Sequence, residues 1–239
     1  MPSSQWGGMV GEEAPSGTKA NSLLTSLKKR SDWSPAVLQL RALTKERRDA
    51  TDERVAGYAG RYQGHRAAMV VDVVLSQRRD YVKFVRPTVE TWRDDHSDMT
   101  LEGLALEGAG ELPRVRHDKR ADDARTIRDV AAGLAAYCAE AGLDEDAGCK
   151  QWAEEVEPLR LVPEIEPSVG AVRGIGLALF AYARMRAGAD ALKPDGHIRA
   201  ALRKTGLVLP YAPQVELQLG EALAEELAVS RLFLDQLLW

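Results

Sequence analysis

Apolar residues in this chain recur at the spacing of an α-helix, and no long stretch alternates as a half-buried strand does. Met69, Val70, Val73 and Val74 follow this spacing inside the nearly continuous apolar stretch 67–74, which predicts a buried helix. Further segments of helical period follow, and they are separated by glycines and prolines rather than by strands. The sequence therefore predicts an all-α protein.

Prolines predict where several of these helices begin or break. Ser34-Pro35 predicts a helix start, with the serine as N-cap and the proline at the first helical position. Tyr81–Trp92 reads as one amphipathic helix in which Pro87 makes a kink or begins a new turn. The prolines of Val162–Pro167 predict an extended segment.

The length and the cysteine content of the chain limit the kind of core that it can form. The chain has 239 residues, enough for one large helical domain or two small ones, and 45% of them are hydrophobic. A core of this size is stable without disulfides or metals. Cys138 and Cys149 are the only cysteines, so they are too few for a four-cysteine iron–sulfur cluster. The four histidines show no metal-ligand spacing, and no metal is predicted.

The first 20 residues differ in composition from the rest of the chain. Residues 1–20 are rich in Gly, Ser and Pro and are predicted to form a disordered tail. The same stretch lacks the basic region and long apolar run of a signal peptide or membrane anchor. We therefore expect a cytoplasmic protein that does not associate with membranes.

The charge distribution is uneven along the chain. The formal net charge is −4, which argues against a generally basic nucleic-acid-binding protein. Ala171–Pro213, however, carries seven bases and only two acids. Such a run is often no more than a solvated helix face, so the charge alone does not establish a binding surface.

The same basic segment holds two motifs. Val172-Arg-Gly-Ile-Gly176 is a glycine turn that opens onto an apolar run and so onto a helix. The unpaired N–H groups at the start of a helix are suited to a phosphate; the alternative is that the turn only joins two packed helices. Asp195 follows a proline, nineteen positions after Gly176, at the mouth of another helix. It is either an N-cap, a catalytic carboxylate, or both.

In order and spacing, these motifs resemble those of the helix-hairpin-helix-GPD (endonuclease III-like) DNA glycosylases. Val172–Gly176 is similar to that family's hairpin, Leu-Pro-Gly-Val-Gly, and Asp195–Ile198 to its Asp-Thr-His-Val/Ile. Val73–Gln77 resembles the end of a family helix, Leu-Leu-Ser-x-Gln. The resemblance covers roughly residues 65–207, together with the closing segment 234–239.

The resemblance implies a two-lobed all-α fold with the active site between the lobes. One lobe would be discontinuous, formed by residues 21–66 and 208–239, and the other would be the hairpin-containing lobe 67–207. The expected partner is double-stranded DNA with a modified base, bound by a monomer in the nucleoid. No cofactor is implied apart from a monovalent cation that the hairpin could hold.

The resemblance also assigns roles to individual residues. Asp195 would be the catalytic carboxylate, which stabilises the positive charge that develops on the sugar and orients water for attack. His197 would help local packing or backbone contact rather than shuttle protons. The expected DNA-binding residues are Arg173, Gly174, Gly176, Lys193, His197 and Arg199.

Excision of a base from duplex DNA requires the nucleotide to be flipped and the gap to be filled by a wedge. Gln77 or Arg78 is the candidate wedge by position, and an ordinary polar helix end is the equally weighted alternative. Tyr81, Trp92 and Trp152 are candidates to stack on the extruded base, although aromatic residues at helical spacing more often belong to the core.

The chain departs from the bifunctional members of that family. They carry a lysine two residues after the hairpin, where this chain has Ala178, and no lysine lies between Gly174 and Leu192. Without an amine for a Schiff base, we expect a monofunctional enzyme that leaves an abasic site. A non-catalytic helix-hairpin-helix DNA-binding module and a helical interaction protein remain the alternatives.

Overall fold

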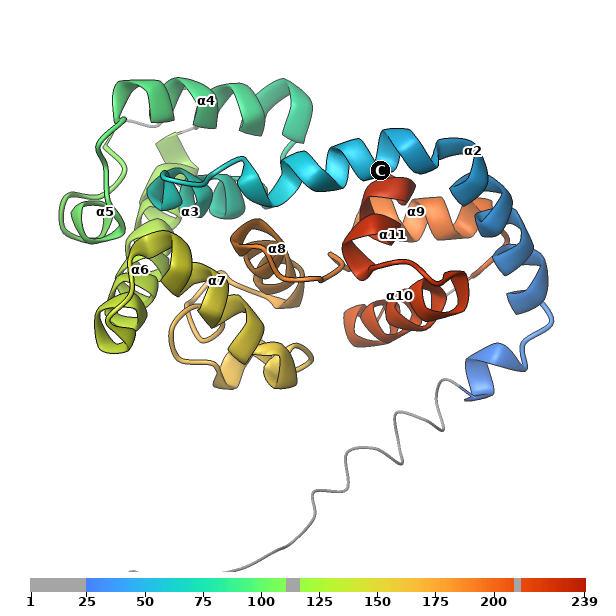
Figure 1. The fold of residues 1–239 in the computed structure, drawn as a ribbon. Helices are drawn as coiled ribbons and strands as arrows, with labels where there is room; N and C mark the ends of the chain where they lie inside the picture. The colour runs from blue at the N-terminus through green and yellow to red at the C-terminus, as the bar shows by residue number, and fades with distance from the viewer. Residues whose placement is uncertain (1–24, 111–116, 209–211) are drawn as a thin grey trace, which may run out of the picture.

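A computed structural model describes residues 25–110, 117–208 and 212–239, and these residues form helices and connecting loops without any strand (Figure 1). The all-α prediction is confirmed. The predicted tail, residues 1–20, lies outside the described residues. The α-helices are α2 (Trp33–Gly60), α3 (Arg66–Leu75), α4 (Arg86–Asp95), α5 (Leu101–Glu107), α6 (His117–Ala141), α7 (Glu145–Glu155), α8 (Leu177–Ala187), α9 (Gly196–Lys204), α10 (Pro213–Leu227) and α11 (Arg231–Leu238). None of the described helices is long and apolar enough to cross a membrane.

Buried hydrophobic residues gather in two large clusters. The first cluster joins α3, α4, α5, α6, α7 and most of α8. The second joins the first half of α2 with α9, α10 and α11. The apolar run 67–74 forms α3 as predicted, and all ten residues of this helix are buried.

α2 and α8 connect the two clusters. α2 is 28 residues long, so Val37 and Leu40 lie in the second cluster while Tyr58 packs against the first. Leu177, at the start of α8, belongs to the second cluster, whereas Leu179 belongs to the first. Side chains from both clusters therefore meet around these two helices.

The packing of α9 differs from the lobe boundaries expected from sequence. Ile198 and Leu202 of α9 are buried in the second cluster, although the expected boundary placed them in the hairpin-containing lobe 67–207. The helix follows this cluster because its apolar face packs against α11. The boundaries themselves stay a prediction.

Two proline-containing segments give different outcomes. Tyr81–Val85 is a π-helix that leads into α4, and Pro87 lies in the first turn of α4, where a missing N–H costs nothing. Pro87 thus begins a new turn, one of the two expected outcomes. The prediction that residues 162–167 are extended is wrong, because Pro163–Ile165 is a 3₁₀ helix. Pro163 starts that turn, and its carbonyl oxygen accepts the N–H of Glu166 at 2.9 Å.

A buried carboxylate fixes the loop that leads into the glycine turn. Glu166 is 2% exposed, and its oxygens accept the backbone N–H groups of Ser168, Val169 and Gly170 at 2.7–2.9 Å. The indole N–H of Trp152 donates to the same carboxylate at 3.2 Å. These bonds set the path of the chain just before the motif 172–176.

Candidate functional site

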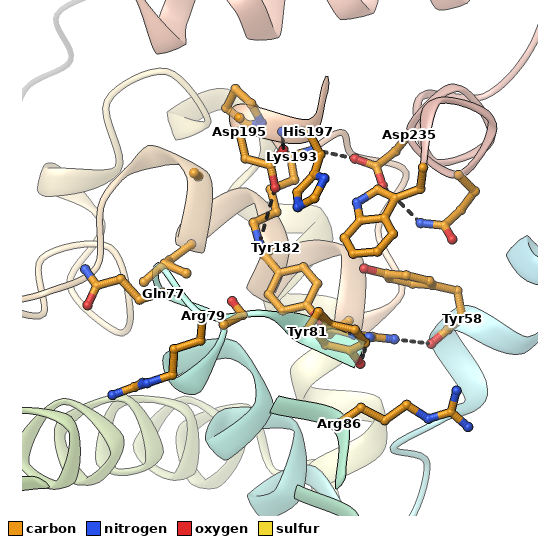
Figure 2. Close-up of a pocket in the computed structure, with 18 of the residues that line it drawn as sticks. Tyr58, Gln77, Arg79, Tyr81, Arg86, Tyr182, Lys193, Asp195, His197 and Asp235 are labelled. Carbon is orange, nitrogen blue, oxygen red and sulfur yellow. Dashed lines mark hydrogen bonds and ion pairs between the residues drawn. The ribbon is translucent and has the colours of Figure 1, made fainter. Parts of the chain in front are cut away.

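A cavity of about 1050 Å³ lies where the two clusters meet. Its walls come from α2, from the segment that joins α3 to α4, from α8, from the loop before α9 and from α11 (Figure 2). A volume of this size is at the upper end for small-molecule pockets, and it exceeds what one nucleobase occupies.

Segments that are far apart in the sequence converge on this cavity. Seven of the nine residues predicted to be catalytic, DNA-binding or wedge residues line it: Gln77, Arg78, Gly176, Lys193, Asp195, His197 and Arg199. Arg173 and Gly174 do not line it but belong to the adjoining turn, where the Gly174 carbonyl oxygen lies 3.5 Å from the Gln77 side-chain nitrogen. The three predicted stretches are therefore parts of one site.

Gly174 is required by the backbone of the turn. Its φ is +100°, a conformation that residues with a side chain rarely adopt. A Cβ atom at this position would lie 2.9 Å from the hydroxyl oxygen of Thr126. That hydroxyl lies 3.0 Å from the carbonyl oxygens of both Arg173 and Asp122 and shares its one hydrogen between them, so α6 contacts the turn directly.

Gly176 has a different reason to be glycine. Its φ is −106°, which any residue adopts, so the turn itself does not need a glycine there. An added Cβ would meet no described atom within 4 Å, and the residue is exposed at the cavity. Gly176 is the N-cap residue of α8 and provides no side chain to cap it. The position leaves an open approach to the first N–H groups of α8.

Asp195 is both an N-cap and a lining residue of the cavity. One of its oxygens accepts the N–H groups of His197 at 2.8 Å and Ile198 at 3.1 Å. The other lies 3.6 Å from the Lys193 ammonium, which in turn lies 4.3 Å from the centre of the Tyr182 ring (Figure 2). Helix dipole and ammonium both interact favourably with a negative charge at this place.

A second carboxylate, Asp235 of α11, lies beside this group (Figure 2). It accepts the Lys193 backbone N–H at 3.0 Å and the Gln236 side-chain amide at 3.0 Å. Burial raises the pKa of Asp235 to about 7, and the nearby charge of Asp195 acts in the same direction. The bond from the Lys193 N–H opposes this shift.

Aromatic rings form much of the remaining wall. The Trp239 indole stacks on the His197 ring with centroids 4.8 Å apart and meets the Tyr81 ring edge-on at 6.0 Å. Tyr58 and Tyr182 also line the cavity. Of the three aromatic candidates taken from sequence, Tyr81 reaches the cavity, whereas Trp92 and Trp152 are fully buried in the first cluster.

Arg186 also lines the cavity, and a carboxylate balances its positive charge. Its guanidinium pairs with Asp72 at 3.0 Å and donates to the hydroxyl oxygens of Tyr81 and Tyr182. It also lies 4.0 Å from the centre of the Tyr58 ring. Burial raises the pKa of Tyr182, so that this phenol stays a hydrogen-bond donor, and it donates to Asp72 at 2.8 Å.

The lining is cationic although the protein is acidic. Eight bases and four acids line the cavity: Arg54, Arg61, Arg78, Arg79, Arg86, Arg186, Lys193 and Arg199, and Glu53, Asp80, Asp195 and Asp235. Arg199 forms a two-point ion pair with the fully buried Glu216, at 2.6 and 2.9 Å, so its expected contact with DNA would compete with this pair.

Arg78 is an exposed cation of the cavity lining. It has no hydrogen bond or ion pair with any described residue, and its φ of +55° is rare for a residue with a side chain. Gln77, beside it, is exposed as well. Both side chains of the predicted wedge thus lie at the cavity rim, and the wedge role stays a prediction.

The described residues do not define a metal site of acidic, histidine or cysteine side chains. They contain no group of three or more His, Cys, Asp or Glu side chains that could hold a metal ion. At the hairpin, the carbonyl oxygens of Val172 and Arg173 accept hydrogen bonds from Ile175 and Thr126. A monovalent cation there stays a prediction.

Comparisons of the chain with protein-family models, with curated proteins and with solved structures found no match. Sequence reasoning missed Tyr58, Arg186, Asp235 and Trp239, all of which line the cavity. The spacing of Asp235 and Trp239, four residues apart, was an available signal, because it places both on one face of a helix.

Proposed function

We propose that this protein is a monofunctional DNA glycosylase with a two-lobed helix-hairpin-helix fold. The observation that carries the proposal is the convergence of Gln77–Arg78, Gly176 and Asp195 on one cavity with a cationic lining. The DNA would lie across the cavity mouth, with a phosphate at the open N-terminal end of α8. Arg173, exposed on the turn, would add charge there.

The cavity suits an extruded nucleotide. Aromatic faces of Trp239 and Tyr58 offer stacking surfaces for a base. The sugar would lie beside Asp195, whose second oxygen makes no bond to the backbone of α9. Gln77 or Arg78 would fill the gap in the duplex.

The proposed reaction breaks the bond between the base nitrogen and C1′ of the sugar. The bonding electron pair leaves with the base, which takes up a proton, while positive charge develops on the sugar ring. Asp195 stabilises that charge electrostatically. Water then bonds to C1′ and gives up a proton, so the products are the free base and an abasic site.

Lys193 is the amine nearest to Asp195, and it bears on the choice between hydrolysis and lyase chemistry. Its ammonium is ion-paired with Asp195 and lies over the Tyr182 ring, so the nitrogen would have to leave both contacts before it could attack the sugar. We therefore retain hydrolysis without strand cleavage. Lys193 would instead contact the sugar-phosphate backbone.

The experiment is a panel of duplexes that each contain one alkylated, oxidised, deaminated or hypermodified base, scored for base release and for alkali-labile sites. The expected result is release from at least one duplex by the wild-type protein. Asp195→Asn keeps the cap, because asparagine also accepts backbone N–H bonds, and is expected to lose at least 100-fold in rate while keeping DNA affinity. An Asp195→Asn variant with full activity would refute the mechanism. Salt-sensitive duplex binding with no base release from any duplex would support the non-catalytic alternative.

A further inference from the structure

The segment that carries Asp195 is tied to α11 at two points. Asp190 accepts the backbone N–H of Leu232 at 2.8 Å, and Asp235 accepts the backbone N–H of Lys193 at 3.0 Å. Each side supplies one carboxylate and one amide, so the two bonds form a reciprocal clasp between residues 190–193 and 232–235. Two separated bonds fix both the position and the direction of the segment.

The two halves of the clasp differ in burial. The Asp235 residue is 2% exposed and its second oxygen accepts the Gln236 amide, whereas the Asp190 side chain is 48% exposed. Water cannot readily replace Asp235 as acceptor, so the Lys193 N–H depends on it. Lys193 is two residues before Asp195, which places this bond at the base of the loop that carries the carboxylate.

We propose that Asp235 is a positioning residue that holds the Lys193–Asp195 loop, and with it the Asp195 carboxylate, in the geometry needed for attack at the sugar. This inference rests on the proposed function. A displacement of about 1 Å in a reacting group costs on the order of 100-fold in rate, so loss of the bond has a measurable consequence.

The charged and titratable groups around Asp235 come from several elements. Lys193 and Asp195 face it from the loop, and Tyr58 faces it from α2. Arg54 of α2 donates to the backbone carbonyl of Gln236 at 2.9 Å. Replacement by asparagine keeps an acceptor oxygen for the Lys193 N–H and removes the titrating group, so it separates the role of the bond from that of the charge.

The test compares Asp235→Ala and Asp235→Asn with Asp190→Ala, which removes a similar carboxylate-to-backbone bond at the exposed half of the clasp. Amide hydrogen exchange at Lys193 is measured in the protein without DNA. Base release is measured at saturating protein, together with duplex affinity. In Asp235→Ala, we expect exchange at Lys193 to rise at least tenfold and the rate to fall about 100-fold, with affinity within threefold. Asp235→Asn and Asp190→Ala should stay within threefold of wild type in rate.

Wild-type protection of Lys193 in Asp235→Ala, or a wild-type rate in that variant, would overturn the proposal. If Asp235→Ala does not fold, Asp235→Leu fills the space without an acceptor, and both readouts apply to it. If the wild-type protein releases no base from any duplex, the proposed function fails. The exchange measurement would then still decide whether Asp235 holds the loop.

Discussion

Gly176→Ala should separate DNA binding from stability. The backbone at Gly176 suits any residue, and an added Cβ has open space around it. Alanine gains about 0.4–1 kcal/mol because the unfolded chain loses conformational freedom, but it is a poorer N-cap residue than glycine by a similar amount, so the free energy of unfolding should change by less than about 1 kcal/mol. The same methyl group would stand before the first N–H groups of α8, where we place a phosphate. Loss of one charge-assisted hydrogen bond there costs about 1.5–3 kcal/mol, or roughly 10- to 150-fold in affinity.

Two other glycines provide controls for this prediction. Gly60, the last residue of α2, also has open space and lies outside the cavity lining, so Gly60→Ala should stabilise the protein without affecting DNA affinity. Gly174 has a φ of +100° and would bring a Cβ to 2.9 Å from Thr126. Gly174→Ala should lose about 1–3 kcal/mol of stability through backbone strain.

Urea unfolding gives the stabilities, and fluorescence anisotropy with an unmodified duplex at one fixed salt concentration gives the affinities. If Gly176→Ala binds DNA as tightly as Gly60→Ala does, the phosphate does not sit at the start of α8. If Gly176→Ala loses as much stability as we expect for Gly174→Ala, a Cβ at position 176 does not have open space around it. Either result would refute the reasoning.

Three further outcomes are expected. Asp195→Ala should lose about 1 kcal/mol of stability and all base release. Asp144→Ala removes the side-chain cap of α7, away from the cavity, and should lose similar stability but no activity. Urea unfolding and base-release assays compare the two variants. Because the pKa of Asp235 is raised to about 7, the folded protein keeps a proton that the unfolded chain releases near pH 4. Stability should therefore fall between pH 4 and 7 by up to about 1.4 kcal/mol per pH unit from this group, and urea unfolding of Asp235→Asn should lack that slope. Borohydride should trap no covalent complex with abasic DNA, and an adduct that Lys193→Ala abolishes would contradict hydrolysis without lyase chemistry.

The sequence was most informative where local rules decide the structure. The helical spacing of the apolar run 67–74 predicted a buried helix, and Asp195 could be placed at a helix mouth because Pro194 precedes it and an apolar face follows. Residues 162–167 were misjudged because proline fits both an extended segment and the start of a 3₁₀ turn, and a tertiary contact makes the choice. Gly170 has no room for a side chain, since its Cβ would lie 1.9 Å from the Pro163 carbonyl oxygen.

The far side of the cavity could not be derived in the same way. Tyr58 lies in the second half of a long charged helix, and Asp235 lies in the last turns of the described chain. No spacing rule relates either of them to Asp195. They reach the cavity because α2 spans both clusters and α11 packs against α2 and α9, which are long-range contacts. For Arg199 the sequence suggested a DNA contact that long-range packing changes, because this cation of the basic segment is paired with the buried Glu216.

The ion pairs in the cavity lining limit what electrostatics can contribute to the proposed function. Arg61 and Arg86 share Glu90, while Arg79, Arg186, Arg199 and Lys193 each pair with a carboxylate of their own, so most of the cationic lining is already compensated. Each phosphate that a protein neutralises contributes about −0.9 to the slope of log affinity against log salt. With a net charge of −4 and few uncompensated cations at the rim, the protein should bind unmodified DNA weakly and with a shallow salt dependence. Discrimination would then have to come from the aromatic walls of the cavity, which only an extruded base can reach.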